Sequence, residues 1–206
     1  MDGYLFPFIL IFIGFVLAIL ALVYLLSKVD RSKRTVSGIF SAVFLLLMVG
    51  SDRLSKVYAV NNFSRTGTET VIPGILGYSY TFNSGAAWGI LSGSTWLLAL
   101  ISLAISLICL YFIFVKPLYS PWSQAALILI TAGGLGNLYD RIVLGGVTDF
   151  LVFLFMNFPL FNLADSCVTT GAGILIVYMF FSSQNAPLLL QTQKAPDEGL
   201  GDESQQ

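Results

Sequence analysis

The chain has 206 residues, of which 56% are hydrophobic and only 10% are charged, and its formal net charge is −1. A soluble domain carries roughly 25% charged residues, so the composition indicates that a bilayer is the solvent of this chain. Histidine is absent, which excludes a Ser-His-Asp triad, a Cys-His dyad, an HExxH zinc site and a His-ligated haem. The isolated Cys109 and Cys167 cannot form a CxxC metal site, and no basic surface is available for nucleic acid. We therefore expect no metal, no cofactor and no nucleic-acid partner.

The first predicted element is an uncharged apolar segment over residues 4–27, which is long enough to span a bilayer as a helix. A signal peptide is the alternative, but the acidic start, the long apolar run and the lack of a small-residue cleavage pattern favour a retained helix. A basic loop over 28–34 and a second helix over 36–60 follow. Residues 61–82 are more polar and alternate aromatic side chains, which predicts an extramembrane segment with short strands.

The second half of the chain contains three further apolar segments of spanning length. The predicted elements are, in chain order, a helix over 95–115, a helix over 122–144 that a glycine cluster and Asp140-Arg141 interrupt, a loop or re-entrant stretch over 145–159, a helix over 162–181 and a disordered polar tail from residue 184. The sequence shows no internal repeat.

Lysine and arginine are unevenly distributed between the two sides of this predicted bundle. Six of the ten follow the first, third or fifth helix: Lys28, Arg31, Lys33, Arg34, Lys116 and Lys194. By the positive-inside rule this side is cytoplasmic. We therefore expect a cytoplasmic C-terminus and an outward-facing N-terminus, with residues 61–82 and 145–159 also outside.

Acidic residues concentrate at the outward ends of the predicted helices. Because ionisable groups at membrane depth are costly, they are by default candidates for function. The alternative for Asp52 and Asp140 is a structural one, in which Asp52 pairs with Lys56 and Asp140 pairs with Arg141 to brace helix ends.

Asp149 and Asp165 differ from these acids because neither has a cation within four residues. Asp165 follows Asn162 by three residues at a predicted helix start, so a capping role alone is the alternative to a catalytic one. Two carboxylates on one side of the membrane, in a chain without histidine, favour acid–base chemistry with a shared proton.

Four groups of short motifs carry a resemblance to a known family. They are DRLSK at 52–56, NSGAAWG at 83–89, GGLGNLYDR at 133–141 with VTDF at 147–150, and FNLADS at 161–166. In this order and spacing they closely resemble signal peptidase II, the bacterial lipoprotein signal peptidase, over about residues 36–183.

The resemblance implies an aspartic endopeptidase of the bacterial cytoplasmic (inner) membrane, active near its outer face. Such an enzyme cleaves diacylglyceryl-modified prolipoproteins just before the lipidated cysteine, contacts membrane lipids, and is inhibited by the lipopeptide globomycin. We expect a monomeric, all-α polytopic membrane protein with a small extracytoplasmic β-cradle. Its parts would be an extra N-terminal helix and basic cytoplasmic loop (1–35), a four-helix catalytic domain (36–183) and a cytoplasmic tail (184–206).

The family motifs also assign site residues. They imply that Asp149 and Asp165 are catalytic, one activating a water while the other, protonated, binds the scissile carbonyl. Asp140 is the second choice for a catalytic acid. The motifs place eight residues in supporting or substrate-binding roles: Asp52, Lys56, Asn83, Gly85, Asn137, Asp140, Arg141 and Asn162. A transporter subunit and a membrane scaffold are the rival functions, but the clustering of acids at one face and the absence of a repeat favour the enzyme.

Overall fold

The computed structural model describes residues 17, 19, 21–22, 24–28, 34–115 and 120–192, with the backbone alone for 34–36 and 183–192. Four of the described helices are long and apolar enough to cross a membrane: Ser37–Asn62, Thr95–Val115, Pro121–Val143 and Leu163–Ser182. The chain is a multi-pass membrane protein, as its composition predicts.

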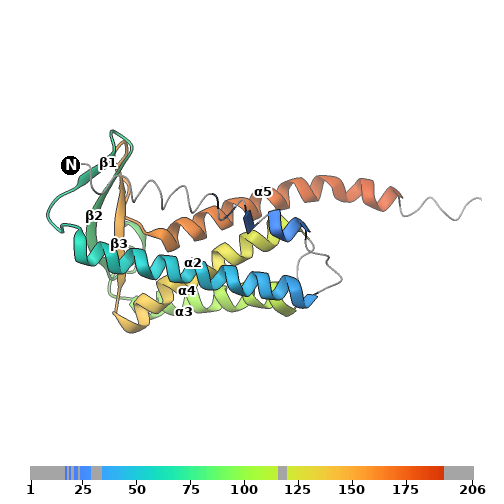
Figure 1. Cartoon of the computed structure of the whole chain (residues 1–206), viewed down its shortest axis with the longest axis horizontal. Coiled ribbons are helices and arrows are strands. Elements are labelled where there is room, and N and C mark those ends of the chain that lie inside the picture. Colours follow the sequence, from blue (N-terminus) through green and yellow to red (C-terminus); the bar gives the residue numbers. More distant parts are fainter. Residues whose placement is uncertain are drawn as a thin grey trace, which may run out of the picture.

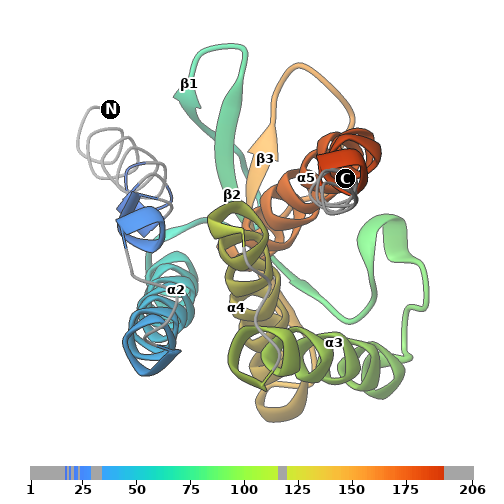
Figure 2. The same cartoon turned by 90° about the vertical axis from the view of Figure 1, so that its right-hand side faces the viewer.

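The bundle is built around one central helix, α4. Its elements are α2 (Arg34–Asn62), α3 (Thr95–Leu110) with its π-helical extension η2 (Tyr111–Val115), α4 (Pro121–Val143) and α5 (Leu163–Thr192). Within its most apolar stretch, 72% of α4 is buried, against 17–28% of the other three spans. Figure 2 accordingly shows α2, α3 and α5 grouped around α4. The exposed apolar side chains of the outer helices are suited to contact lipid.

The glycines of α4 do not interrupt this helix. They allow the neighbouring helices to pack close to it. The predicted interruption is wrong, because α4 is continuous from Pro121 to Val143. A Cβ on Gly133 would lie 2.2 Å from the carbonyl oxygen of Ala164 in α5, and one on Gly134 would lie 2.5 Å from Ser106 Oγ in α3. Small residues at such crossings allow close backbone packing in membrane bundles.

The same close packing predicts how substitutions of two α5 glycines affect stability. A Cβ at Gly171 would lie 2.7 Å from the backbone oxygen of Ala126, whereas a Cβ at Gly173 meets no atom within 4 Å. We expect Gly171→Ala to lower the free energy of unfolding by about 1–3 kcal/mol through overpacking. Gly173→Ala should leave it unchanged or slightly raise it, because Ala is the better helix former. Thermal unfolding of both variants in detergent checks this, and equal effects would contradict the packing explanation.

A three-stranded antiparallel sheet covers one end of the bundle, here called the sheet end (Figure 1). Its strands, in spatial order, are β1 (Glu69–Ile72), β2 (Leu76–Asn83) and β3 (Val147–Phe153). The strands predicted within residues 61–82 are thus confirmed. The loop or re-entrant stretch predicted over 145–159 is wrong over residues 147–153, which form β3. The first four residues of β3 are all buried, so the strand lacks the alternation of apolar and polar residues by which strands are recognised.

The sheet is anchored to α2 by an apolar cluster. Phe150 of β3 packs with Tyr78 of β2 and with Phe63, which follows the last turn of α2. The rings of Phe63 and Tyr78 stack with centroids 4.1 Å apart. This cluster fixes β3, and therefore Asp149 beside Phe150, relative to the helices.

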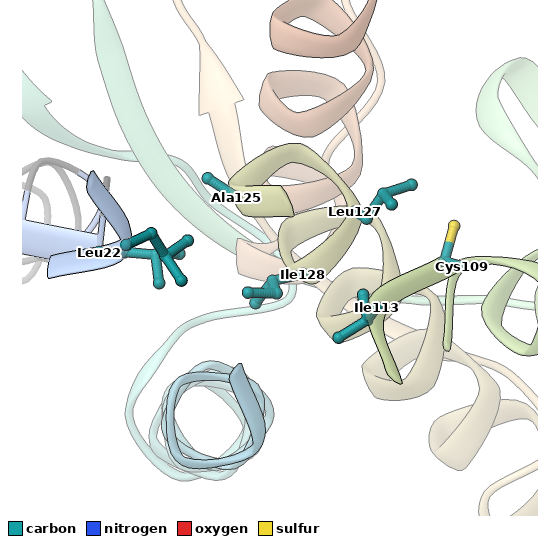
Figure 3. Packing of buried hydrophobic residues seen from close by; sticks show 7 residues of the cluster. Leu22, Cys109, Ile113, Ala125, Leu127 and Ile128 are labelled. Atoms are coloured by element: carbon teal, nitrogen blue, oxygen red, sulfur yellow. The ribbon is translucent and has the colours of Figure 1, made fainter. Parts of the chain in front are cut away.

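Three predicted segments lie partly outside the described residues: the extra helix over 4–27, the basic loop over 28–34 and the polar tail from residue 184. Of the extra helix expected over 4–27, the described residues from 17 onward are helical. Leu22 and Leu26 are buried in a cluster with Ile113, Ala125 and Ile128, and Figure 3 shows Leu22 directed toward the last two. At the other terminus, α5 continues to Thr192, past its expected end at 181, so the disorder predicted from residue 184 is wrong over 184–192. The rest of the expected tail is not among the described residues.

Candidate active site

A large cavity lies between the sheet and the helices. Its volume is about 1420 Å³, and α2, α3, α4, α5 and all three strands contribute to its wall, which is mostly apolar. Six of the residues predicted from the sequence line it: Asn83, Gly85, Asn137, Arg141, Asp149 and Asp165. The other four are fully buried: Asp52, Lys56, Asp140 and Asn162. The structure therefore gathers all ten predicted residues at the sheet end, six on the cavity surface and four in the protein interior.

Asp149 lies on β3, where side-chain amides hold both of its carboxylate oxygens. Asn83 Nδ2 donates to Oδ2 at 3.0 Å, and Asn162 Nδ2 donates to Oδ1 at 2.7 Å. Burial, followed by the charge of Asp165, raises the pKa of Asp149 to about 6, although these hydrogen bonds and the charge of Lys56 oppose the shift. A carboxyl in this range can change protonation state near neutral pH.

Asp165 lies in the first turn of α5 and forms a reciprocal cap with Asn162. The Asp165 N–H donates to Asn162 Oδ1 at 3.0 Å, and the Asn162 N–H donates to Asp165 Oδ2 at 3.0 Å. The other oxygen, Oδ1, accepts Asn137 Nδ2 at 2.7 Å. The predicted capping geometry is present, and it leaves the Asp165 side chain on the cavity wall.

Asn162 connects the two carboxylates. Its side-chain amide donates to Asp149 while its backbone N–H donates to Asp165. The same Nδ2 lies 3.2 Å from Asn137 Oδ1, and that oxygen also accepts Lys56 Nζ at 3.0 Å. A continuous polar network thus joins β3, α4, α5 and α2 around the two aspartates.

An ion cluster lies behind this network. Lys56 Nζ is 2.8 Å from Asp52 Oδ2 and 3.1 Å from Asp140 Oδ2, and Arg53 Nη1 is 3.2 Å from Asp140 Oδ1. The negative charges of the two acids are neutralised by the positive charges of Lys56 and Arg53, as buried charges require. The predicted pair of Asp52 with Lys56 is confirmed.

The predicted pair of Asp140 with Arg141 is wrong. Consecutive residues of a helix point about 100° apart, so Asp140 faces α2, where Lys56 and Arg53 are its partners. Arg141 instead lines the cavity, and its Nη1 donates to the Asn137 carbonyl oxygen at 3.4 Å. Arg53 is the contributor that sequence reasoning missed, because its partner is 87 residues away.

The ion cluster also positions the start of α5. Asp52 Oδ1 accepts the backbone N–H of Ala164 at 2.9 Å, one residue before Asp165. A Cβ on Gly136 would lie 2.5 Å from Asp52 Oδ2, so this close contact requires glycine. Asp52 thereby links α2 to the first turn of α5 and helps to place the Asp165 carboxylate.

The sequence profile of the family described as signal peptidase (SPase) II matches residues 43–181, which include every predicted site residue. This chain belongs to the signal peptidase II family.

Relatives and solved structures agree with this assignment. The lipoprotein signal peptidase of Lactobacillus gasseri is 41% identical over 143 residues, which are 69% of this chain and 92% of the relative. That of Enterococcus faecalis is 36% identical, over 68% of this chain and 87% of the relative. A bacterial membrane enzyme solved in meso at 2.3 Å resolution superposes with a TM-score of 0.62 and 31% identity, over 78% of this chain and 94% of the other. A second bacterial membrane enzyme, solved in meso at 1.9 Å resolution, superposes with a TM-score of 0.61 and 33% identity, over 68% of this chain and 91% of the other.

Membership of the signal peptidase II family makes the chain a peptidase. Among the described residues, no group of three or more Cys, Asp or Glu side chains could hold a metal ion. The polar side chains that line the cavity include two carboxylates, two asparagine amides and a guanidinium, besides several hydroxyl groups. Carboxylates can move protons and the other groups can donate hydrogen bonds, which is the set that hydrolysis of an amide requires.

Proposed function

We propose that this signal peptidase II is an aspartic endopeptidase that removes signal peptides from diacylglyceryl-modified prolipoproteins, cutting just before the lipidated cysteine. The observation that carries the proposal is the contact of one residue, Asn162, with both Asp149 and Asp165 at the wall of a large apolar cavity. A transporter would be expected to distribute its acids along a path. Here the acids of the bundle gather at the sheet end.

The two aspartates divide the acid and base roles. Asp165 lies in the first turn of α5, where the helix dipole favours a negative charge, and we assign it the role of base. Asp149 has its pKa raised to about 6, so we assign it the protonated role, although the two carboxyls titrate as a coupled pair. Asp165 takes a proton from water while the oxygen attacks the scissile carbonyl carbon, and Asp149 donates its proton to the carbonyl oxygen. Collapse of the tetrahedral intermediate returns the proton of Asp149, and Asp165 transfers its own to the leaving amine.

Neighbouring groups complete the site. Asn83 and Arg141 line the cavity near the aspartates and can donate hydrogen bonds to the developing oxyanion. At about 1420 Å³ the cavity exceeds the range of roughly 300–1,000 Å³ usual for small-molecule sites. Such a volume suits a substrate that brings both a peptide and acyl chains.

We assign the sheet end to the outer face of the cytoplasmic membrane. The support is the distribution of charge, because six of ten cations lie in segments predicted on the opposite side. In this orientation the C-terminus is cytoplasmic, and the scissile bond of a membrane-inserted precursor reaches the cavity at the outer surface.

The test of the function is the fate of the precursor. Purified protein in detergent should cleave a diacylglyceryl-modified precursor peptide, and the same peptide without lipid should be cleaved at least ten-fold more slowly. Cells depleted of this chain should accumulate lipid-modified precursors. Normal maturation of every lipoprotein in depleted cells, together with no cleavage in vitro, would contradict the proposal.

The raised pKa of Asp149 predicts a pH dependence of stability. Its ordinary pKa is 3.8 and its folded-state pKa is about 6, so the folded protein binds this proton more tightly than the unfolded chain. The resulting stabilisation is fully present below about pH 4 and is lost as the pH rises through 6. The melting temperature of the wild type should therefore fall relative to that of Asp149→Asn between about pH 4 and about pH 7. In Asp165→Asn the loss of stability should move to lower pH, because the negative charge of Asp165 no longer raises the pKa of Asp149. Parallel curves of melting temperature against pH for wild type and Asp149→Asn would contradict the raised pKa of Asp149.

A further inference from the structure

The N-terminal helical segment, defined here as the described residues between 17 and 28, packs against the bundle by one face. Ile19, Leu22 and Leu26 follow the spacing of one helical face. Leu22 and Leu26 are only 1% and 5% exposed, whereas Leu17 and Tyr24 on the opposite side are 57% and 62% exposed. The segment thus has a docked face and a face suited to lipid. It precedes residues 43–181, the part of the chain that the family profile matches.

The docked face packs against side chains of the bundle, and we call this contact surface the groove. Leu22 and Leu26 join a cluster with Ala125 and Ile128 on α4, which also contains Cys109 of α3 and Ile113 of η2 on the other side of α4. Ile19 packs against a second cluster, whose members come from α2, α4 and α5: Met48, Leu129, Ala132 and Cys167. Figure 2 shows the segment, in blue, on the side of α4 that lies between α2 and α5.

This groove adjoins the active-site cavity. Met48 belongs to the cluster that Ile19 contacts and also lines the cavity, and Ser51, about one turn further along α2, lines it too. We call this side the α2 flank. The opposite side, the α3 flank, is lined by Ser102 and Ile105 of α3. A helix bound along the cavity therefore has two sides from which to approach, and the N-terminal segment occupies the groove next to one of them.

We propose that the N-terminal helical segment closes the α2 flank, so that the apolar helix of the signal peptide binds along the α3 flank. This inference rests on the proposed function. The segment belongs to the same chain, so it competes for the groove at a high effective concentration. A precursor helix would have to displace Ile19, Leu22 and Leu26 to bind there. On the α3 flank Ile105 remains 45% exposed and open to an apolar ligand.

Photo-crosslinking tests the side of approach. The photoreactive residue p-benzoylphenylalanine replaces either Ile105 on α3 or Ile174, which packs on α5 in the same cluster as Ile19. The probe is a tagged diacylglyceryl-modified precursor peptide, held uncleaved by Asp149→Asn in the full-length protein. We expect at least ten-fold more crosslinked peptide at position 105 than at position 174. Equal yields, or a higher yield at 174, would overturn the inference.

A matched pair of variants separates closure from simple stabilisation. Leu22→Ser with Leu26→Ser weakens the docked face, while Leu17→Ser with Tyr24→Ser alters the lipid-facing side of the same segment. Undocking should raise the yield at position 174 at least five-fold, and the control should not. A lowered melting temperature with an unchanged yield would show a stabilising role only and would overturn the inference.

The two proposals can fail separately. Wild-type protein that does not cleave the lipidated precursor contradicts the proposed function, whatever the crosslinks show. Wild-type protein that cleaves the precursor while the uncleaved peptide crosslinks equally at positions 105 and 174 contradicts the side of approach alone.

Discussion

Replacing either Asp149 or Asp165 with Asn should abolish processing of a lipidated precursor while leaving the fold intact. General acid–base catalysis contributes about 10²–10⁴-fold, so we expect kcat to fall by at least about 100-fold in each single variant. Asn has nearly the same shape as Asp but can neither accept the proton of the attacking water nor donate an acidic proton to the scissile carbonyl. The double variant should be little worse than either single one, because the two carboxyls act as a unit.

Two other acids serve as controls for this result. Glu69→Gln alters an exposed acid of β1 and should retain near-wild-type cleavage. Asp140→Asn removes a partner of Lys56 and Arg53; it should lower the melting temperature while the folded fraction still cleaves. If Asp140→Asn abolished cleavage by folded protein and either Asp149→Asn or Asp165→Asn remained active, the catalytic pair would be assigned wrongly.

The helices were predictable because their signal is local. A spanning helix needs about 20 apolar residues, and the bounds of α2, α3 and α4 differ from the predictions by only a few residues. The strand β3 was missed for a physical reason, since burial of Val147, Thr148, Asp149 and Phe150 alike removes the alternation that marks a strand. Its place in the sheet depends on pairing with β2, some 70 residues earlier in the chain.

The residues that form the site were predictable from motifs, but the hydrogen bonds and ion pairs between them were not. Adjacent charges suggested a pair of Asp140 with Arg141, whereas the geometry of a helix points Asp140 toward α2. The contact of Asn162 with both aspartates depends on how β3 meets the first turn of α5. Such contacts between distant segments follow from tertiary packing, which single-sequence patterns do not record.

Lys56→Met should be the most destabilising substitution in the ion cluster. Lys56 is only 1% exposed, and its Nζ is held by Asp52, Asp140 and Asn137. Methionine fills a similar volume but leaves two buried carboxylates with one remaining cation, Arg53. Breaking a buried ion pair in this way costs about 3–5 kcal/mol, which thermal or denaturant unfolding in detergent would detect. Arg53→Met should cost less, because its side chain is 38% exposed and Lys56 still pairs with both carboxylates.

The matched double variant tests whether uncompensated charge is the cause. Asp52→Asn together with Lys56→Met leaves Asp140 and Arg53 as a neutral pair, so it should be more stable than Lys56→Met alone despite carrying one more substitution. Lys56 also donates to Asn137 Oδ1, and Asn137 Nδ2 donates to Asp165. The double variant should therefore recover stability but not full kcat, because the amide that holds Asp165 has lost the group that fixes its orientation. Recovery of both stability and kcat would show that Lys56 acts through charge balance alone. Recovery of neither stability nor kcat would show that the loss of Lys56 disturbs packing rather than electrostatics.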